Sequence, residues 1–169
     1  MPMSLLAQPG FREAFDALAR RHAPELVRYA HNRAGNLDDA RDIVQGALLK
    51  AWGAWQEGSR PDQPRAWLYR IVHNELVNHT RSQNVRSRRF APTATNPDEL
   101  LGIETRETIE AVRKLPPPFG EVIALHYLQG LSIVETARVL GVPEGTAKSQ
   151  LARGLDQLRE KLGQQRRPT

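Results

Sequence analysis

Apolar residues recur at helical spacing along most of the chain. Phe11 and Phe15 share one face of a first helix, predicted over 11–22. Pro24 fits the first turn of a second helix, which we expect to end near Gly35. The N-terminal part of the chain therefore predicts two short helices in succession.

The clearest amphipathic pattern belongs to a third helix, which Asn36 or Asp38 can cap. Its apolar stripe consists of Ile43, Val44, Ala47, Leu48, Ala51, Trp52 and Trp55. Residues 58–64 are rich in glycine and proline and predict a loop. A fourth helix is expected over 65–81. It buries Trp67, Leu68, Ile71, Val72 and Leu76.

The helical pattern is then interrupted. Residues 82–97 are polar and rich in arginine, and they contain two prolines, which predicts a linker. A second helical domain is expected from Asp98 onward. Pro116–Pro118 ends its first helix, and 119–127 forms the next.

Residues 132–143 carry the helix-capping and turn residues expected of two helices joined by a tight turn. Ser132 and Glu135 fit a capping box, Gly141 suits a left-handed C-cap, and Pro143 suits the first turn of the last helix. The buried stripe of that helix consists of Ala147, Leu151, Leu155, Leu158 and Leu162. Because its outward face is small and cationic, the pattern is typical of a helix-turn-helix that places one helix in the major groove of DNA.

The charge distribution supports DNA as a partner. The net charge is +5 and the pI is about 10.1. Seven arginines lie between Arg60 and Phe90 against two acidic residues, and a second basic zone covers 132–169. Two separate basic zones indicate two contacts with a polyanion.

Composition excludes several kinds of site. The chain has no cysteine, which rules out disulfides and thiolate metal sites. His73 and His79 lack the neighbours of a metal site, so we expect neither a metal nor a cofactor. No segment is apolar for the ~20 residues that span a bilayer, and the N-terminus lacks the pattern of a signal peptide. We therefore expect no membrane insertion and a cytoplasmic location.

Several motifs occur in a characteristic order. They are Asp39–Gln45, Leu48–Trp52, Ala66–Asn74, Leu115–Pro116 and Gly145–Leu151. Together they closely resemble an extracytoplasmic-function (ECF) RNA polymerase sigma factor, from about Phe11 to Leu162. The resemblance implies an all-α fold of two small helical domains joined by a flexible linker, with a σ2 domain at 8–81, the linker at 82–97 and a σ4 domain at 98–163.

The resemblance also implies a function. Such a factor is not an enzyme; it binds core RNA polymerase and directs promoter-specific transcription initiation. In the family, σ2 binds the clamp coiled coil of the β′ subunit and melts the −10 element, whereas σ4 reads the −35 duplex and sits on the β flap. An anti-sigma factor and promoter DNA are therefore the other implied partners, in the bacterial cytoplasm.

The third predicted helix would contact the polymerase. The residues that match family positions or lie near that interface are Asp39, Asp42, Gln45, Leu48, Leu49 and Trp52. Taken alone, the acidic residues are better explained as helix caps, and Trp52 as core. Arg41 and Gly46 depart from the family, because acidic residues are usual at both positions. Both departures weaken the expected β′ contact.

The fourth helix would bind the −10 strand. The expected contacts are Arg65, Tyr69, Arg70, Asn74, Asn78 and Arg81. Asn74 matches the family position that reads a flipped base, and an amide can pair with a base edge. The arginines would bind phosphates. Tyr69 is open to two interpretations, stacking on a base or packing inside the domain.

The last helix would read the −35 duplex. The expected contacts are Thr146, Lys148, Ser149, Gln150, Ala152 and Arg153. Arg153 can grip guanine with two hydrogen bonds, and Lys148 can bind a base or a phosphate. Gln150 stands where the family usually has arginine, so the family's −35 consensus does not transfer directly to this chain.

Two other functions remain open from the residues. A stand-alone helix-turn-helix regulator would bind duplex DNA tightly without polymerase, usually as a dimer. A sigma-like mimic that titrates an anti-sigma factor would be expected to lose its DNA-reading residues, whereas this chain keeps Asn74, Lys148, Ser149 and Arg153. An enzyme is the least favoured class, because no catalytic or phosphate-binding motif is present.

Overall fold

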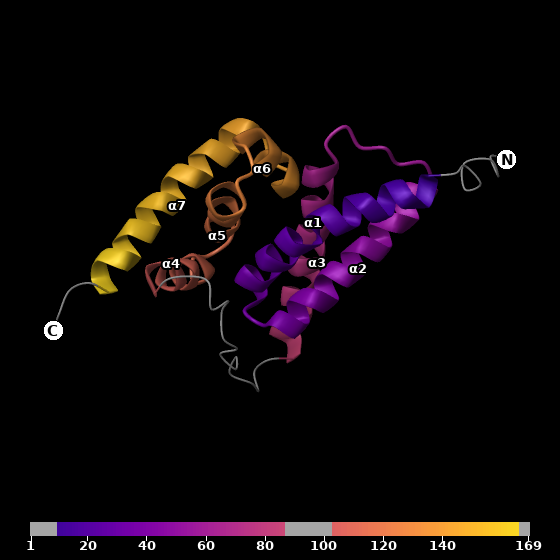
Figure 1. Ribbon diagram of the computed structural model, residues 1–169. Helices are drawn as coiled ribbons and strands as arrows, with labels where there is room; N and C mark the ends of the chain where they lie inside the picture. The colour runs from indigo at the N-terminus through magenta and orange to yellow at the C-terminus, as the bar shows by residue number, and fades with distance from the viewer. Residues whose placement is uncertain (1–9, 87–102, 166–169) are drawn as a thin grey trace.

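The computed structural model describes residues 10–86 and 103–165, which form helices and no strand. The expected all-α fold is confirmed. The helices are α1 (Phe11–Ala34), α2 (Leu37–Gln56), α3 (Pro64–Arg86), α4 (Ile103–Arg113), α5 (Phe119–Ile123), the π-helical turn η1 (Ala124–Leu128), α6 (Ile133–Leu140) and α7 (Glu144–Gln165). Figure 1 shows two groups, an N-terminal group of α1–α3 and a C-terminal group of α4–α7.

The first helix corrects one prediction. The structure has one continuous helix, α1, with Pro24 inside it, where the sequence predicted two. Pro24 removes one hydrogen bond and crowds the preceding turn. Leu26, Tyr29 and Ala30 are nevertheless fully buried on one side of the same helix. Their burial offsets the cost of the proline and keeps the two halves of α1 aligned.

The next two helices begin as expected. The Asn36 side chain caps α2 by accepting hydrogen bonds from the backbone N–H groups of Asp38 and Asp39, at 2.8 and 3.2 Å. α3 runs through Arg86, beyond its predicted end at Arg81. No proline interrupts 82–86, so nothing stops the helix there. The remainder of the expected linker, 87–97, lies outside the described residues.

The C-terminal group contains the predicted helix-turn-helix. The capping box of Ser132 and Glu135 is present at the start of α6. Gly141 ends α6 with φ 67°, the left-handed conformation that glycine adopts without strain. The helix predicted over 119–127 is divided into α5 and η1. α7 continues to Gln165.

The two groups pack directly against each other. α3 lies in the middle of Figure 1, with α1 and α2 on one side and α6 on the other. Its face toward the core contains Leu68, Tyr69 and Val72, which are almost completely buried. The helix proposed to bind the −10 strand is therefore also the main contact between the two groups.

Candidate nucleic-acid and polymerase interfaces

The outward face of α7 is a compact polar surface. Thr146, Lys148, Ser149, Ala152 and Arg153 are all exposed, as expected for residues that enter a groove. The opposite side of the helix is fixed by packing, because Ala147 is fully buried. These five side chains therefore lie on the outward side of α7, where the helical spacing predicted them.

Local contacts leave this face available. Lys148 pairs with Glu144 one turn earlier at 2.8 Å, and the Ser149 hydroxyl donates to the Gly145 carbonyl at 3.1 Å. Such exposed pairs contribute little to stability and are easily exchanged for another partner. Gln150 differs from the others, because it is half-buried and its Oε1 atom has no hydrogen-bond partner among the described residues.

A second polar surface runs along α3. Arg70, Asn74, Asn78 and Arg81 are exposed, and their spacing places them on one face of the helix. The structure thus brings together four of the six residues expected to contact the −10 strand. The face carries two cationic and two amide side chains, which suits a strand that offers both phosphates and base edges.

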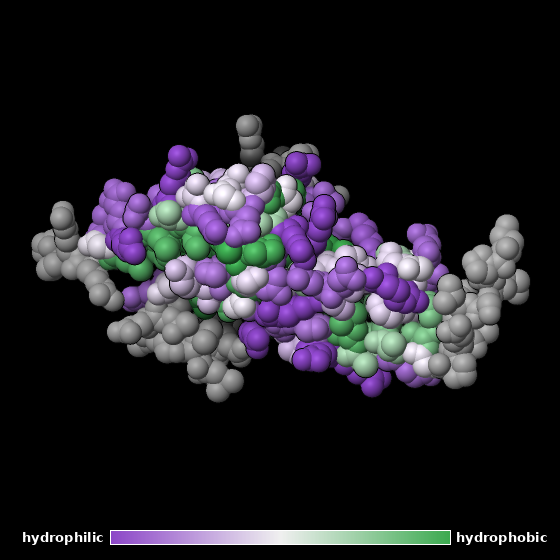
Figure 2. Space-filling view, turned by 90° about the horizontal axis from the view of Figure 1, so that it is seen from above, coloured by the Kyte–Doolittle hydropathy of each residue, from purple (hydrophilic) through white to green (hydrophobic). Residues whose placement is uncertain are grey.

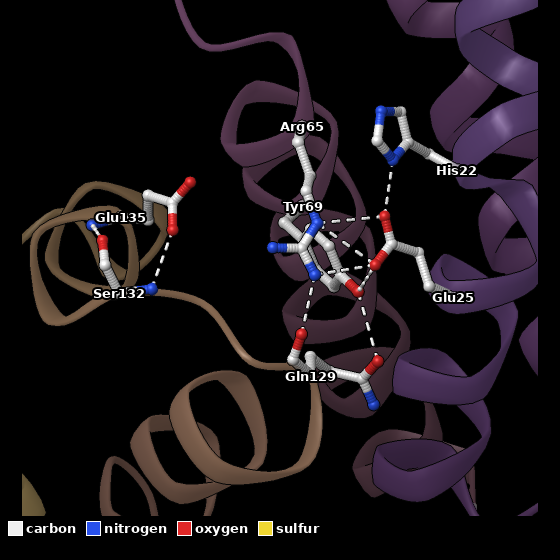
Figure 3. Close-up of polar contacts among 7 residues, drawn as sticks. All are labelled: His22, Glu25, Arg65, Tyr69, Gln129, Ser132 and Glu135. Carbon is white, nitrogen blue, oxygen red and sulfur yellow. Dashed lines mark hydrogen bonds and ion pairs between the residues drawn. The ribbon is translucent and has the colours of Figure 1, made fainter.

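Arg65 and Tyr69 are placed differently. Figure 3 shows both side chains turned toward Glu25 of α1 and toward Gln129, which follows η1. Arg65 pairs with the Glu25 carboxylate at 2.8 Å and donates to the Gln129 carbonyl at 2.7 Å. The Tyr69 hydroxyl contacts Glu25 at 3.1 Å and Gln129 Oε1 at 3.2 Å. Tyr69 is fully buried, so packing rather than stacking describes it in this structure.

Glu25 is the centre of this network. Burial by itself would raise its pKa, but hydrogen bonds from Arg65, His22 and Tyr69 outweigh that effect and lower the pKa. Burial also raises the pKa of Tyr69, which stays a neutral hydrogen-bond donor. Glu25 and Gln129 were not predicted from the sequence, because residues that pair from so far apart in the chain leave no periodic signal.

The expected polymerase surface lies on α2. Asp42, Gln45 and Leu49 are exposed on one side of the helix. Leu49, a large apolar side chain, is 67% exposed. Leu48 is half-buried at the edge of the same surface. This side of α2 therefore presents two polar side chains beside one exposed leucine.

The other two residues expected on this surface have partners inside the chain. The Asp39 carboxylate lies 3.5 Å from His79 Nε2 of α3. The Trp52 ring packs against Phe11 and Phe15, with centroid distances of 5.9 and 5.2 Å. Trp52 therefore stabilises the packing of α1 on α2. This agrees with the alternative interpretation of Trp52 as a core residue.

The face seen in Figure 2 is mainly hydrophilic. Figure 2 shows two hydrophobic areas on the visible face, one toward α7 and one toward the N-terminal end. In the described part of the chain, no group of histidine and acidic residues is arranged to hold a metal ion. None of the helices described is long and apolar enough to span a membrane.

Two family models match the two helical groups. The Sigma-70 region 2 model matches residues 18–86, and the Sigma-70 region 4 model matches residues 105–158. The ECF RNA polymerase sigma factor SigM of Mycobacterium tuberculosis is 34% identical over 161 residues, which cover 91% of this chain and 80% of SigM. The chain belongs to the ECF family of RNA polymerase sigma factors. It is an alternative sigma factor, which directs transcription initiation.

Other known proteins match over a similar share of this chain at lower sequence identity. SigW of Bacillus subtilis is 26% identical over 170 residues, covering 90% of this chain and 91% of SigW. The sigma factor RpoE of Bartonella quintana, solved in complex with the anti-sigma factor NepR, matches with a TM-score of 0.78 and 26% identity over 89% of this chain and 98% of RpoE. CnrH, solved with the cytosolic domain of CnrY, matches with a TM-score of 0.69 and 27% identity over 90% of this chain and 89% of CnrH.

The matching family regions identify the two groups of helices. The N-terminal group is the σ2 domain and the C-terminal group is the σ4 domain. In this sigma factor, the exposed faces of α2 and α3 belong to σ2, and the exposed face of α7 belongs to σ4.

Proposed function

We propose that this sigma factor uses three separate surfaces to start transcription. The α2 face binds the β′ clamp coiled coil of core RNA polymerase, the α3 face captures the −10 strand, and the α7 face reads the −35 duplex. The observation that carries the proposal is the exposure of all three faces on a scaffold whose opposite sides are buried. Promoter specificity then comes from the sigma factor and catalysis from the polymerase.

The α3 face has the chemistry needed to hold an unpaired strand. Asn74 presents an amide that can both donate to and accept from the edge of a flipped base. Arg70 and Arg81 lie on either side of it along the same face and provide charge for the flanking phosphates. We assign base reading to Asn74 and strand binding to the two arginines.

The α7 face has the chemistry needed to read a duplex. Arg153 forms no ion pair among the described residues, so its guanidinium is available for a guanine edge. Lys148 and Ser149 lie on the preceding turn and contact phosphate or base. Each domain has few contacts of its own, so binding becomes strong only when the polymerase fixes both domains at the correct separation.

We propose an anti-sigma factor as a further partner, in the bacterial cytoplasm. RpoE and CnrH, which this chain resembles along most of its length, were both solved with another protein bound. In RpoE that protein is an anti-sigma factor. A partner of the same class would keep this sigma factor from the polymerase.

The role of Asn74 predicts a specific defect in strand opening. Asn74→Ala removes one base-edge contact, so we expect open-complex formation to fall about tenfold while affinity for core polymerase stays unchanged. Permanganate reactivity of promoter thymines measures opening, and fluorescence anisotropy measures core binding. The matched control is Asn32→Ala, because Asn32 lies outside all three faces. An equal loss of core affinity would contradict the assignment.

The role of Arg153 predicts a change in −35 discrimination. Arg153→Ala should reduce the preference for the best −35 sequence over single-base variants by about tenfold. Arg159→Ala is the matched control, because Arg159 is another exposed arginine on the same helix, paired with Asp156 at 3.1 Å. Competition transcription on a set of mutated −35 sites measures both. Unchanged discrimination in Arg153→Ala would refute the assignment.

A further inference from the structure

A cavity of about 370 Å³ lies between the σ2 and σ4 domains. One side of it is formed by the C-terminal half of α1 and by α3, and the other side by the end of α4, the following turn and α5. Figure 1 shows α4 beside the C-terminal end of α1. We refer to this space as the interdomain cavity. Arg81 is the only lining residue that also belongs to one of the three proposed surfaces.

The interdomain cavity has the size and the walls of a small-molecule site. An apolar cavity of roughly 150 Å³ holds a benzene molecule, and natural ligand pockets begin at about 300 Å³. Leu76, Val77, Leu115 and Pro117 contribute apolar walls, and Leu76 and Leu115 are almost completely buried. The cavity can therefore accommodate an apolar body of one or two rings.

Three arginines line the cavity, and two of them have acidic partners. Arg33 pairs with Glu121 at 3.1 Å, and Arg113 pairs with Glu110 at 2.8 Å. Arg81 is exposed, and it forms no ion pair and no hydrogen bond among the described residues. The cavity therefore has one uncompensated positive charge, and this charge favours an anionic ligand.

His73 supplies a second hydrogen-bond donor. Its Nδ1 atom lies 3.1 Å from the hydroxyl of Tyr29, which is fully buried and forms no other hydrogen bond with the described residues. A buried hydroxyl needs an acceptor, so we assign it as the donor to Nδ1. Burial lowers the pKa of His73, so the ring is neutral and carries its hydrogen on Nε2. Nε2 has no partner among the described residues.

His73 and Arg81 can bind the same group of a ligand. Both line the cavity from α3, and they are eight residues apart, which is about 12 Å along the helix axis. Side chains in a helix lean toward its N-terminus, so the long Arg81 side chain extends back toward His73. Val77 lies between them on the same wall. An anionic group at this wall meets a charge, a neutral donor and an apolar surface together.

We propose that the interdomain cavity binds a small organic anion, an aromatic carboxylate of one or two rings. The carboxylate accepts hydrogen bonds from Arg81 and from His73 Nε2, and the ring packs against Leu76, Val77 and Leu115. The inference goes beyond the proposed function, because none of the three surfaces requires a small molecule.

The ligand contacts both domains at once. The anion-binding donors belong to σ2, whereas Leu115 and Pro117 belong to σ4. An arrangement that separates the two domains divides the site, so the ligand binds best when they are packed together. By linkage, the ligand stabilises the packed arrangement by the same factor. The site thus makes the arrangement of the two domains sensitive to the concentration of a small molecule.

A pair of probes of the same shape tests the site. The probes are 2-naphthoate and its neutral counterpart 2-naphthamide, each titrated into the free, full-length protein by isothermal titration calorimetry. We expect 2-naphthoate to saturate one site and to bind about tenfold more tightly than 2-naphthamide, because the amide does not pair with the Arg81 charge. We also expect 2-naphthoate to raise the midpoint of thermal unfolding as its concentration increases.

Variants of Arg81 locate the anion. Arg81→Gln should weaken 2-naphthoate about tenfold and leave 2-naphthamide unchanged, whereas Arg81→Lys, which keeps the charge, should restore most of the affinity. Arg70→Gln is the matched control. Arg70 is another exposed arginine of α3 and belongs to the same proposed DNA surface, but it does not line the cavity.

A variant of Val77 locates the ring. Val77→Trp places a large side chain on the wall between His73 and Arg81 and fills part of the cavity, so it should weaken both probes about tenfold. Circular dichroism and thermal unfolding without a probe verify that the variant keeps its helices. Arg81 is exposed, so the Arg81 variants test the site even if Val77→Trp does not fold.

Three results would overturn the site. The first is that 2-naphthoate does not saturate at millimolar concentrations. The second is equal binding by Arg81→Gln and the unmodified protein, or an equal loss in Arg70→Gln, which would indicate general attraction to a basic surface. The third is unchanged binding in a folded Val77→Trp variant. None of these measurements uses DNA or polymerase, so their outcome is independent of the proposed function.

Discussion

At two glycines inside helices, the neighbouring atoms decide whether a larger side chain can be accommodated. At Gly46 of α2, the nearest heavy atom to an added Cβ is Glu75 Oε2 at 3.9 Å, an ordinary contact distance. At Gly154 of α7, an added Cβ would lie 3.0 Å from Ile123 Cδ1 and 3.3 Å from the Phe119 carbonyl oxygen. Only the second glycine is required by packing, because it allows α5 to approach α7 closely.

Alanine should therefore have opposite effects at these positions. Gly46→Ala should raise the free energy of unfolding by up to ~1 kcal/mol through better helix propensity. Gly154→Ala should lower it by about 1–3 kcal/mol, since the Phe119 backbone cannot yield without moving α5. Urea denaturation followed by circular dichroism measures both. A lower free energy of unfolding for Gly46→Ala would contradict the prediction that a Cβ fits at this position without a clash.

At the scale of the element, the helix-turn-helix depends on its capping box. The Ser132 hydroxyl accepts from the Glu135 N–H at 3.1 Å, and the Glu135 carboxylate accepts from the Ser132 N–H at 2.7 Å. Both contacts appear at the left of Figure 3. They satisfy N–H groups that the first turn of α6 would otherwise leave unpaired.

Removing that cap should weaken the σ4 domain. Ser132→Ala should cost about 1 kcal/mol of stability. Ser82→Ala is the matched control, because the Ser82 hydroxyl donates to the carbonyls of Asn78 and His79 at an exposed position of α3, where we expect little change. The midpoint of thermal unfolding is measured for both variants and for the unmodified protein. Equal midpoints for Ser132→Ala and the unmodified protein would contradict the role of the capping box.

Periodicity and caps predicted most elements correctly, and the exceptions have physical causes. The stripe of α2, the Asn36 cap and the Gly141 turn were readable because each depends on nearby residues. The continuity of α1 across Pro24 was not readable, since it depends on the burial of Leu26 and Tyr29 against other helices. The C-terminal extension of α3 over residues 82–86 was not predicted, because a polar helix end and a polar linker have similar amino-acid compositions.

At the scale of the whole molecule, the packing of σ2 on σ4 was beyond sequence reasoning. The exposed faces of α3 and α7 were predicted, because exposure follows from helical spacing. The sequence left Tyr69 open between packing and stacking, because its burial depends on contacts with Tyr29 and Glu25 of α1 and with Gln129 of the other group, none of them close to it in the chain. Whether a side chain of α3 is buried or exposed thus depends on where the second domain lies.

A cavity of about 370 Å³ between the domains holds His73, whose Nδ1 lies 3.1 Å from the Tyr29 hydroxyl. The titratable and charged groups that line it with His73 are Tyr29, Arg33, Arg81, Arg113 and Glu121. Burial, the largest effect, lowers the pKa of His73; Glu121 opposes that change and Arg33 adds to it. His73 therefore stays neutral in the folded protein at pH values where an unfolded histidine takes up a proton.

This difference gives stability a defined pH dependence. Below the ordinary histidine pKa of about 6.5, the unfolded chain binds a proton that folded His73 does not, so the free energy of unfolding should fall as the pH decreases. His73→Gln should lose this component and show a shallower decline between about pH 6.5 and pH 5. Urea titrations across that range measure both proteins. Parallel curves would contradict the lowered pKa.

The most direct test of the account as a whole is transcription from fragmented host genomic DNA. Core RNA polymerase is assayed with and without this sigma factor, and the RNA 5′ ends are sequenced. We predict new start sites that share −10 and −35 motifs at a fixed separation. The absence of new starts, with core binding verified in the same preparation, would contradict the claim that these surfaces direct initiation.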